Sequence, residues 1–164
     1  MNTVHTKKLT AAAMMAALCC VATMVIQIPS PMNGYVNLGD CFVLLSAFIL
    51  GPAWGAAAAG IGSMMADVLS GYMHYAVATL VIKGAMAFAA AMIYSAGRTT
   101  LKAVLGGIVA EAIMVLGYFL FACILMGEGL AAALSIPGNV VQGIVGIIAG
   151  MLLLRAAEKM KISF

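Results

Sequence analysis

Long apolar segments separated by short polar ones run along most of the chain. The first of them, Leu9–Ile28, follows Lys7 and Lys8 and contains no charged residue. A helix of about 20 residues spans about 30 Å, the thickness of the hydrocarbon core of a bilayer. A cleavable signal peptide is the alternative, but the polar stretch that follows offers no small-x-small cleavage site. We therefore expect a retained membrane-spanning helix.

The segment Cys41–Ala66 carries no charge and is interrupted by Gly51 and Pro52. If it formed one long tilted helix, Arg98 and Lys102 would lie on the outer side of the membrane, against the positive-inside tendency. Two short helices that meet at Gly51 and Pro52 place every basic helix end on the inner side. The charge pattern therefore predicts an all-α protein with six transmembrane helices and cytoplasmic N- and C-termini.

The other boundaries follow from the polar residues between the apolar segments. Pro29–Gly39 is expected to form an outer loop, and Asp40 is expected to cap the second helix. Pro137 suits the first turn of the last helix. The later helices are expected at Ala53–Ser70, Ala76–Gly97, Ala103–Gly127 and Pro137–Arg155, joined by Gly71–Tyr75, Arg98–Lys102 and Glu128–Ile136.

Composition supports a membrane protein and argues against several other classes. With 65% hydrophobic residues, 8% charged residues and a mean hydropathy of +1.16, a soluble domain of this length would expose too much apolar surface. The basic residues form no stripe of the kind that binds nucleic acid. The four cysteines lack metal-ligand spacing, and the sequence contains no nucleotide-binding or catalytic motif. We expect one membrane-embedded domain, residues 1–164, with no metal, no cofactor and no enzymatic activity.

Lys83 is the only Lys or Arg inside an expected membrane segment. A lone ammonium in hydrocarbon costs a few kcal/mol or more, so Lys83 needs a partner or a wet cavity. Helix geometry places Asp67 at a similar depth, and we expect an Asp67–Lys83 ion pair that either joins helices or binds a ligand. Asp40 is expected at the outer surface. Glu111 lies deeper and is either buried in its protonated form or lines the base of a cavity.

The last helix adds two amides, Asn139 and Gln142, on one face and near the depth of Lys83. Amides both donate and accept hydrogen bonds, which suits recognition of a neutral heterocycle, although bonds between helices are the alternative. Aromatic side chains that could stack on such a ring, or face lipid instead, are Tyr72, His74, Tyr75, Tyr118 and Phe121.

The first helix carries two small-xxx-small pairs, Ala12 with Ala16 and Ala13 with Ala17. Small residues at this spacing let two helix backbones approach closely. Such a face either packs inside the protein or docks another membrane protein.

Several motifs together resemble a known family. They are NLGD from Asn37, LGP from Leu50, ATLVIKG from Ala78 and PGNVVQGIVG from Pro137. With the alanine pairs of the first helix, they resemble the substrate-binding S components of energy-coupling factor (ECF) vitamin transporters. The most similar subgroup is the one associated with riboflavin, hydroxymethylpyrimidine or pyridoxine uptake.

The resemblance implies a six-helix S component in the cell membrane of a prokaryote. It implies an outer pocket for a vitamin, built by the outer loops and later helices, with Pro29–Gly39 as its lid. It also implies that one alanine pair contacts a transmembrane scaffold subunit, and that two cytoplasmic ATPases drive transport. The expected substrate-binding residues are Lys83, Asn139, Gln142, Asp67, Tyr75, Asn37 and Glu111, and the expected docking residues are Ala12, Ala13, Ala16 and Ala17.

Two other functions remain open at this point. One is a self-sufficient proton-coupled carrier that uses Glu111 and Lys83. The other is a purely structural membrane protein, which would require the buried polar side chains to satisfy one another with no cavity between them. Within the vitamin hypothesis, a pyridine or pyrimidine ring is favoured over riboflavin.

Overall fold

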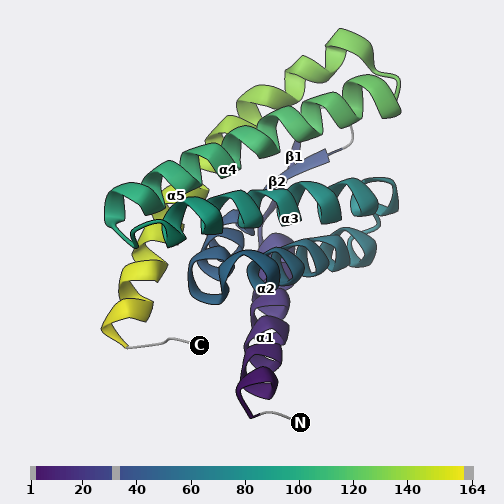
Figure 1. Ribbon diagram of the computed structural model, residues 1–164. Helices are drawn as coiled ribbons and strands as arrows, with labels where there is room; N and C mark the ends of the chain where they lie inside the picture. Colours follow the sequence, from purple (N-terminus) through teal and green to yellow (C-terminus); the bar gives the residue numbers. More distant parts are fainter. Residues whose placement is uncertain (1–2, 31–33, 161–164) are drawn as a thin grey trace.

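Five long helices and one small β-hairpin make up the structure, a computed structural model in which residues 3–30 and 34–160 are described. All five helical regions are long and apolar enough to cross a membrane. Figure 1 shows the chain from α1 to α5. The elements are α1 Thr3–Val25, β1 Gln27–Ser30, β2 Gly34–Asn37, α2 Asp40–Leu69, α3 Met73–Ser95, α4 Thr100–Leu120, η1 Phe121–Leu125, η2 Gly129–Ser135 and α5 Ile136–Lys159.

The helix α2 is broken at Gly51, whose backbone adopts φ 78° and ψ −176°. A Cβ on Gly55 would lie 2.8 Å from the carbonyl oxygen of Ser46. In a straight helix residues nine apart are separated by about 13 Å along the axis, so the chain must turn back at this point. The break expected at Gly51 and Pro52 is therefore confirmed, and α2 consists of two helical arms. That both arms cross the membrane stays a prediction.

Small residues allow the helices to pack closely. A Cβ on Gly62 of α2 would lie 2.2 Å from the carbonyl oxygen of Ala16, so α1 rests directly on the α2 backbone. A Cβ on Gly106 of α4 would lie 2.9 Å from the carbonyl oxygen of Ala90 in α3. In a bilayer, where lipid is as apolar as leucine, such close backbone contact is a main source of helix association.

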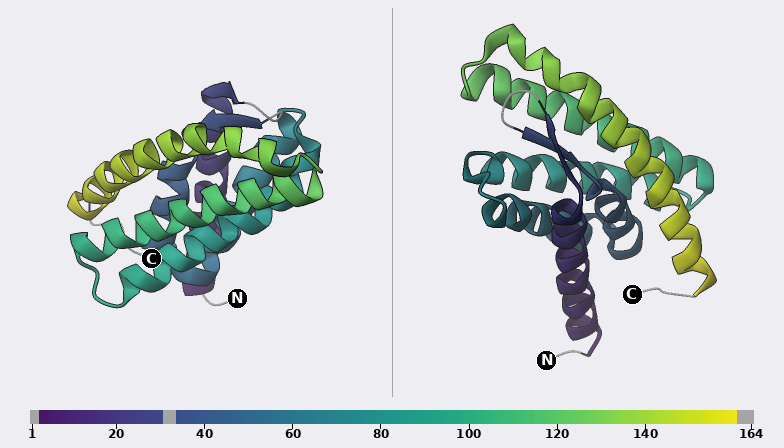
Figure 2. Two further views of the ribbon diagram at one scale, coloured as in Figure 1. Left: turned by 90° about the horizontal axis from the view of Figure 1, so that it is seen from above. Right: turned by 180° about the vertical axis from the view of Figure 1, so that it is seen from behind.

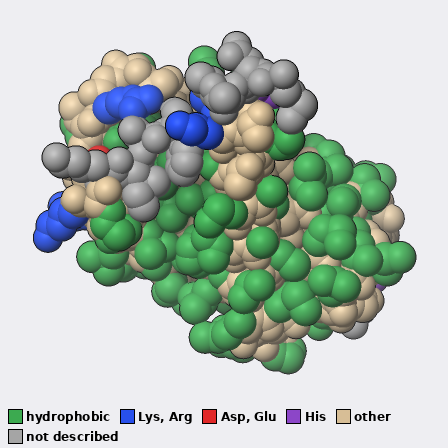
Figure 3. Space-filling model, turned by 90° about the horizontal axis from the view of Figure 1, so that it is seen from below, with side chains coloured by type: hydrophobic (Ala, Val, Ile, Leu, Met, Phe, Trp, Pro, Cys, Tyr) green, Lys and Arg blue, Asp and Glu red, His purple; other side chains and the backbone are tan. Residues whose placement is uncertain are grey.

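The outer surface and the two ends differ in chemistry. Large hydrophobic side chains such as Val77, Leu101 and Leu152 are exposed around the helices, as expected for contact with lipid. Lys and Arg side chains gather at one end of the face in Figure 3, and hydrophobic side chains cover most of the rest. Figures 1 and 2 show that α1 begins and α5 ends on the same side of the molecule.

Several expected boundaries are wrong. The expected loop Pro29–Gly39 contains part of an antiparallel β-hairpin, in which Gln27 pairs with Asn37, so the protein is mostly helical with one small hairpin. Residues 31–33 of that loop lie outside the described residues. The first helix begins six residues earlier than expected, at Thr3 in place of Leu9. The expected loop Glu128–Ile136 is largely the short 3-10 helix η2.

Replacing Gly51 with alanine should destabilise the fold through its backbone alone. No heavy atom lies within 4 Å of a Cβ built there, but its φ of 78° is rarely adopted by a residue with a side chain. We expect Gly51→Ala to lower the free energy of unfolding by about 1–3 kcal/mol, measured by thermal unfolding in detergent.

Gly84→Ala is the matched control, because Gly84 is helical and a Cβ there would meet only an ordinary contact at 3.6 Å. Equal stability of the two variants would contradict the assignment of Gly51 as a conformationally required turn.

Candidate functional site

A polar cavity of about 50 Å³ lies under the β-hairpin, between the ends of α2, α3, α4 and α5. Nine elements contribute to its wall, which is why residues far apart in the sequence meet there. The lining residues are Thr23, Ser30, Gly34, Tyr35, Asn37, Ser63, Asp67, Tyr75, Thr79, Lys83, Tyr118, Ala122, Ser135, Asn139 and Gln142.

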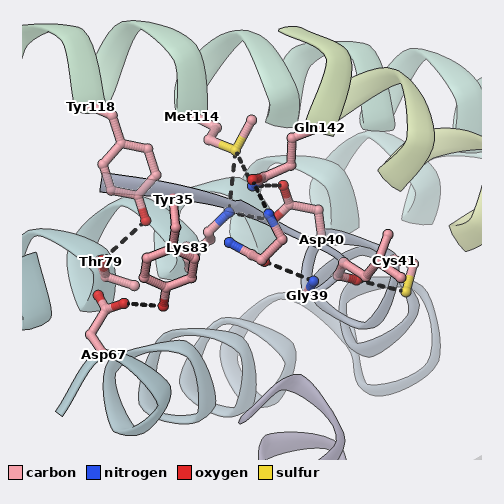
Figure 4. Close-up of polar contacts among 12 residues, drawn as sticks. Tyr35, Gly39, Asp40, Cys41, Asp67, Thr79, Lys83, Met114, Tyr118 and Gln142 are labelled. Carbon is pink, nitrogen blue, oxygen red and sulfur yellow. Dashed lines mark hydrogen bonds and ion pairs between the residues drawn. The ribbon is translucent and has the colours of Figure 1, made fainter. Parts of the chain in front are cut away.

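Lys83 of α3 forms a buried ion pair with Asp40, the first residue of α2. The exposed fraction is 2% for Lys83 and 0% for Asp40. The Lys83 ammonium also contacts the Met114 sulfur at 3.2 Å and lies 5.6 Å from the centre of the Tyr118 ring. Figure 4 shows these groups converging on the ammonium. An ammonium has three N–H donors, so one remains for a further acceptor.

Gln142 of α5 links this ion pair to the hairpin. Its Nε2 donates to Asp40 Oδ2 at 2.6 Å, and its Oε1 accepts from the backbone N–H of Asn37 at 2.7 Å. The Asn37 side chain in turn accepts from the Gly39 N–H at 2.8 Å. The buried charge and strand β2 therefore belong to one hydrogen-bond network.

Asp67 belongs to a second cluster of polar side chains, on another side of the cavity. Its carboxylate accepts a hydrogen bond from the Tyr35 hydroxyl of β2 (Figure 4). Burial, helped by this hydrogen bond to Asp67, raises the pKa of Tyr35, so the phenol keeps its proton and remains a donor. The network fastens the hairpin to α2.

Other polar and aromatic groups face the cavity. The Ser63 hydroxyl is buried without a hydrogen-bond partner among the described residues. Asn139 is 8% exposed and lines the wall next to Gln142 on α5. Tyr75 lies 5.2 Å from Phe121 and 6.2 Å from Tyr118 between ring centres. Amide and hydroxyl groups beside aromatic rings can hydrogen-bond the edge of a planar ligand and contact its faces.

Six of the seven expected substrate-binding residues line this one cavity, namely Lys83, Asn139, Gln142, Asp67, Tyr75 and Asn37. The seventh, Glu111, does not. It lies in a separate apolar depression of about 400 Å³ between α4 and α5, and a Cβ on Gly143 would lie 3.1 Å from its carboxylate. Both Glu111 oxygens lack a hydrogen-bond partner in the described part of the chain. That any of the seven contacts substrate stays a prediction.

Two expectations about the charges are wrong. Lys83 pairs with Asp40, not with Asp67, and Asp40 is fully buried and not at the outer surface. The physical reason lies at the start of α2. Gly39 is the N-cap residue, so Asp40 is the first residue of the helix and its carboxylate pairs with Lys83 inside the protein. Residue depth along straight helices could not reveal this, because Asp40 follows the hairpin and its depth depends on where the hairpin sits.

Sequence reasoning missed several cavity residues, among them Thr79 and Ser63. Their spacing could have revealed them. Thr79 lies four residues after Tyr75 and four before Lys83, and Ser63 lies four before Asp67, so each shares a helix face with an expected site residue. Thr79 contacts the Tyr118 hydroxyl at 3.0 Å. The residues Thr23, Ser30 and Ser135 had no comparable signal.

The two alanine pairs of α1 have different surroundings. Ala12 is buried and Ala16 is half-buried against Gly62, whereas Ala13 and Ala17 are exposed. One pair therefore belongs to the internal packing, and the other faces outward from the protein.

Removing the Lys83 charge should destabilise the fold, because the Asp40 carboxylate would be left buried without its ion-pair partner. We expect Lys83→Met to cost about 3–5 kcal/mol in unfolding free energy, measured by thermal unfolding in detergent. The double variant Lys83→Met/Asp40→Asn should be more stable than Lys83→Met alone. Lys7→Met, at an exposed position, is the control. A double variant no more stable than Lys83→Met would argue against the pairing.

Comparisons with known proteins agree with this architecture. The family model described as "ECF-type riboflavin transporter, S component" matches residues 3–159. The solved structure titled "Structure and mechanism of the S component of a bacterial ECF transporter" superimposes with a TM-score of 0.76 at 25% identity, covering 95% of this chain and 98% of that one. The S component for biotin from an ECF-type ABC transporter gives a TM-score of 0.55 at 17% identity, covering 94% of each chain, which shows a shared fold.

Two curated proteins are similar in sequence. A Pyrococcus woesei protein named "Uncharacterized protein in gap 3'region" is 43% identical over 135 residues, covering 79% of this chain and 87% of that one. The "Thiamine precursor transporter HmpT" of Lactococcus lactis subsp. cremoris (strain MG1363) is 29% identical over 161 residues, covering 97% and 92%. Family, fold and membrane-spanning helices thus agree, and the chain belongs to the integral membrane S components of ECF-type transporters, in the riboflavin transporter S-component family.

Proposed function

We propose that this S component binds a small, water-soluble aromatic heterocycle of the vitamin-precursor type, with a substituted pyrimidine as the favoured substrate. The observation that carries the proposal is the cavity under the β-hairpin, where the Asn139 amide, the Ser63 hydroxyl and the Tyr75 ring face one space. Ring nitrogens and hydroxymethyl groups offer the acceptors and donors that these groups require.

The volume of the cavity favours a substrate with a single ring over riboflavin, which has three fused rings. A volume of about 50 Å³ holds a few water molecules, and ligand pockets usually enclose about 300–1,000 Å³. Any vitamin must therefore displace part of the wall, and a single-ring pyrimidine or pyridine requires less displacement than riboflavin. The name of the Lactococcus lactis relative, a thiamine precursor transporter, supports the pyrimidine. Pyridoxine is the next candidate.

Within this proposal, Lys83 and Gln142 contact the substrate through polar atoms that their shared partners, Asp40 and Met114, do not use. Lys83 uses two of its donors on Asp40 and Met114, and the third can donate to a substrate acceptor. Asp67 acts through Tyr35, because it holds the hydroxyl of that residue at the cavity wall. Asn37 contributes through β2. Glu111, being outside the cavity, is not assigned a substrate contact.

The proposed transport partners are a transmembrane scaffold subunit and two cytoplasmic ATPases, with this chain supplying substrate recognition. The exposed pair Ala13 and Ala17 on α1 supports this arrangement, because it offers a small-residue face that internal packing does not use. The proton-coupled carrier is the less favoured function, because the chain belongs to the S components of ECF-type transporters, and the resemblance to that family implies that partner ATPases supply the energy. If vesicles containing this chain alone accumulated substrate under a proton gradient, the proton-coupled carrier would become the favoured function.

Asn139→Ala should weaken pyrimidine binding without unfolding the protein. Loss of one amide hydrogen-bond partner costs about 1–2 kcal/mol, so we expect the dissociation constant of hydroxymethylpyrimidine to rise about tenfold, measured by isothermal titration calorimetry in detergent. Pyridoxine and riboflavin, titrated in parallel, should bind more weakly to the unmodified protein.

Val141→Ala is the control, since Val141 lies on the same helix and is 58% exposed, away from the cavity. Unchanged affinity in Asn139→Ala would remove this residue from the site. Tight binding of riboflavin alone would show that the cavity opens much further than a single ring requires.

Ala13→Trp should block uptake in cells while leaving substrate affinity unchanged, because an indole on the exposed face of α1 would prevent close approach of a scaffold helix. Uptake of labelled substrate and co-purification with the scaffold measure the first effect, and calorimetry measures the second. Ala16→Trp is the contrasting variant, and it should unfold the protein because Ala16 packs on Gly62. Normal uptake by Ala13→Trp would place the docking face elsewhere.

A further inference from the structure

A second polar pocket, of about 230 Å³, lies at the opposite end of the helices from the β-hairpin. It is formed where α3 passes into α4 and where α5 ends. Its lining combines polar groups with a small apolar wall and includes Arg98, Thr99, Met151, Leu154, Arg155 and Glu158. The substrate site described above uses none of these residues.

Positive charge dominates this pocket. Arg98 and Arg155 both line it, and neither forms an ion pair within residues 3–30 and 34–160. The acidic residue in the wall, Glu158, accepts a hydrogen bond from the Tyr94 hydroxyl at 3.2 Å. Lys102 and Lys159, which lie close along the chain to these arginines, add further positive charge at this end. Two arginines and one glutamate therefore line one pocket, and neither arginine forms an ion pair with the glutamate.

The backbone contributes to the same space. Thr99 caps α4, accepting from the Lys102 N–H at 3.3 Å, and Thr99, Thr100 and Ala103 at this positively polarised helix start line the pocket. Arg98, just before this cap, has a φ of 45° and is the only residue other than glycine with positive φ in the described ranges. Such a conformation is unfavourable for a residue with a side chain, and it persists where the surroundings require it. The turn at the end of α3 is closed by the backbone N–H groups of Gly97 and Arg98, which both donate to the Tyr94 carbonyl oxygen.

We propose that this pocket binds the phosphate group of an anionic membrane phospholipid. A guanidinium recognises phosphate through two parallel hydrogen bonds, and two arginines beside a helix start provide several such donors. The pocket opens at the end of the membrane helices, where phospholipid headgroups lie, and Met151 and Leu154 offer apolar contact below them. Basic pockets between membrane helices bind anionic headgroups in this way.

A general excess of basic residues on one side of the membrane is the competing explanation, since it requires no specific pocket. The two explanations differ in whether the position of each charge matters. Lys7 and Lys8 supply the comparison, because they precede the first apolar segment and do not line the pocket.

The experiment uses the full chain in detergent, with phosphatidylglycerol or phosphatidylcholine added at equal amounts. Native mass spectrometry measures the fraction of protein that retains lipid, and thermal unfolding measures stabilisation. We expect preferential retention of phosphatidylglycerol by the unmodified protein. Arg98→Gln/Arg155→Gln should retain it at least fivefold less, while Lys7→Gln/Lys8→Gln should retain it as the unmodified protein does. Should the double arginine variant fail to fold, Arg155→Gln alone serves, with an expected reduction of at least twofold.

Three results would overturn the proposal. Equal lipid retention by the arginine variants and the unmodified protein would exclude the pocket. An equal loss in the two double variants would show attraction by overall charge. Stabilisation by inorganic phosphate equal to that by phosphatidylglycerol, with displacement of the lipid, would assign the pocket to a soluble anion.

Discussion

A positive charge buried inside a membrane protein is energetically costly unless an opposite charge or polar groups compensate it. Here the compensation comes from Asp40, which reaches Lys83 from the start of α2. The pair is sealed from solvent, and Gln142 and Met114 occupy most of the remaining polar contacts. Because a buried ion pair contributes little net stability but is costly to break, its main effect is to fix one arrangement of α2, α3 and α5.

That arrangement depends on close packing as much as on charge. The turn at Gly51 lets the two arms of α2 pack together, and Gly62 and Gly106 allow backbone contact with α1 and α3. Only then do α2, α3, α4 and α5 present their polar faces to the same point. The cavity is therefore a product of helix packing at small residues, with the polar groups held at its wall.

Much of this could be predicted from sequence, for identifiable reasons. Apolar segments located the helices, and the interruption at Gly51 and Pro52 located the break in α2. The i, i+3 spacing of Asn139 and Gln142 indicated a shared helix face, and both line one cavity with Lys83, whereas their contact with substrate stays a prediction. Local periodicity could not predict that Asp40, and not Asp67, pairs with Lys83, because the choice is made by contacts across 43 residues of sequence. The β-hairpin was missed for a similar reason, since each strand has only four residues and is defined by its pairing with the other strand.

Glu111 shows a further limit of sequence reasoning. Its position in an apolar segment suggested either a cavity floor or a buried neutral acid, and the sequence left both open. The structure places it between α4 and α5, against Gly143, away from the cavity wall. Depth along a helix says how far a residue lies from the membrane surface, but the direction of its side chain depends on how the helix is rotated against its neighbours.

The connection from the Asn37 N–H through Gln142 to Asp40 couples the hairpin to the buried charge. One amide side chain contacts β2 through its oxygen and the Asp40 carboxylate through its nitrogen. A shift of the strand and a rotation of the carboxylate therefore cannot be independent of each other while both contacts persist.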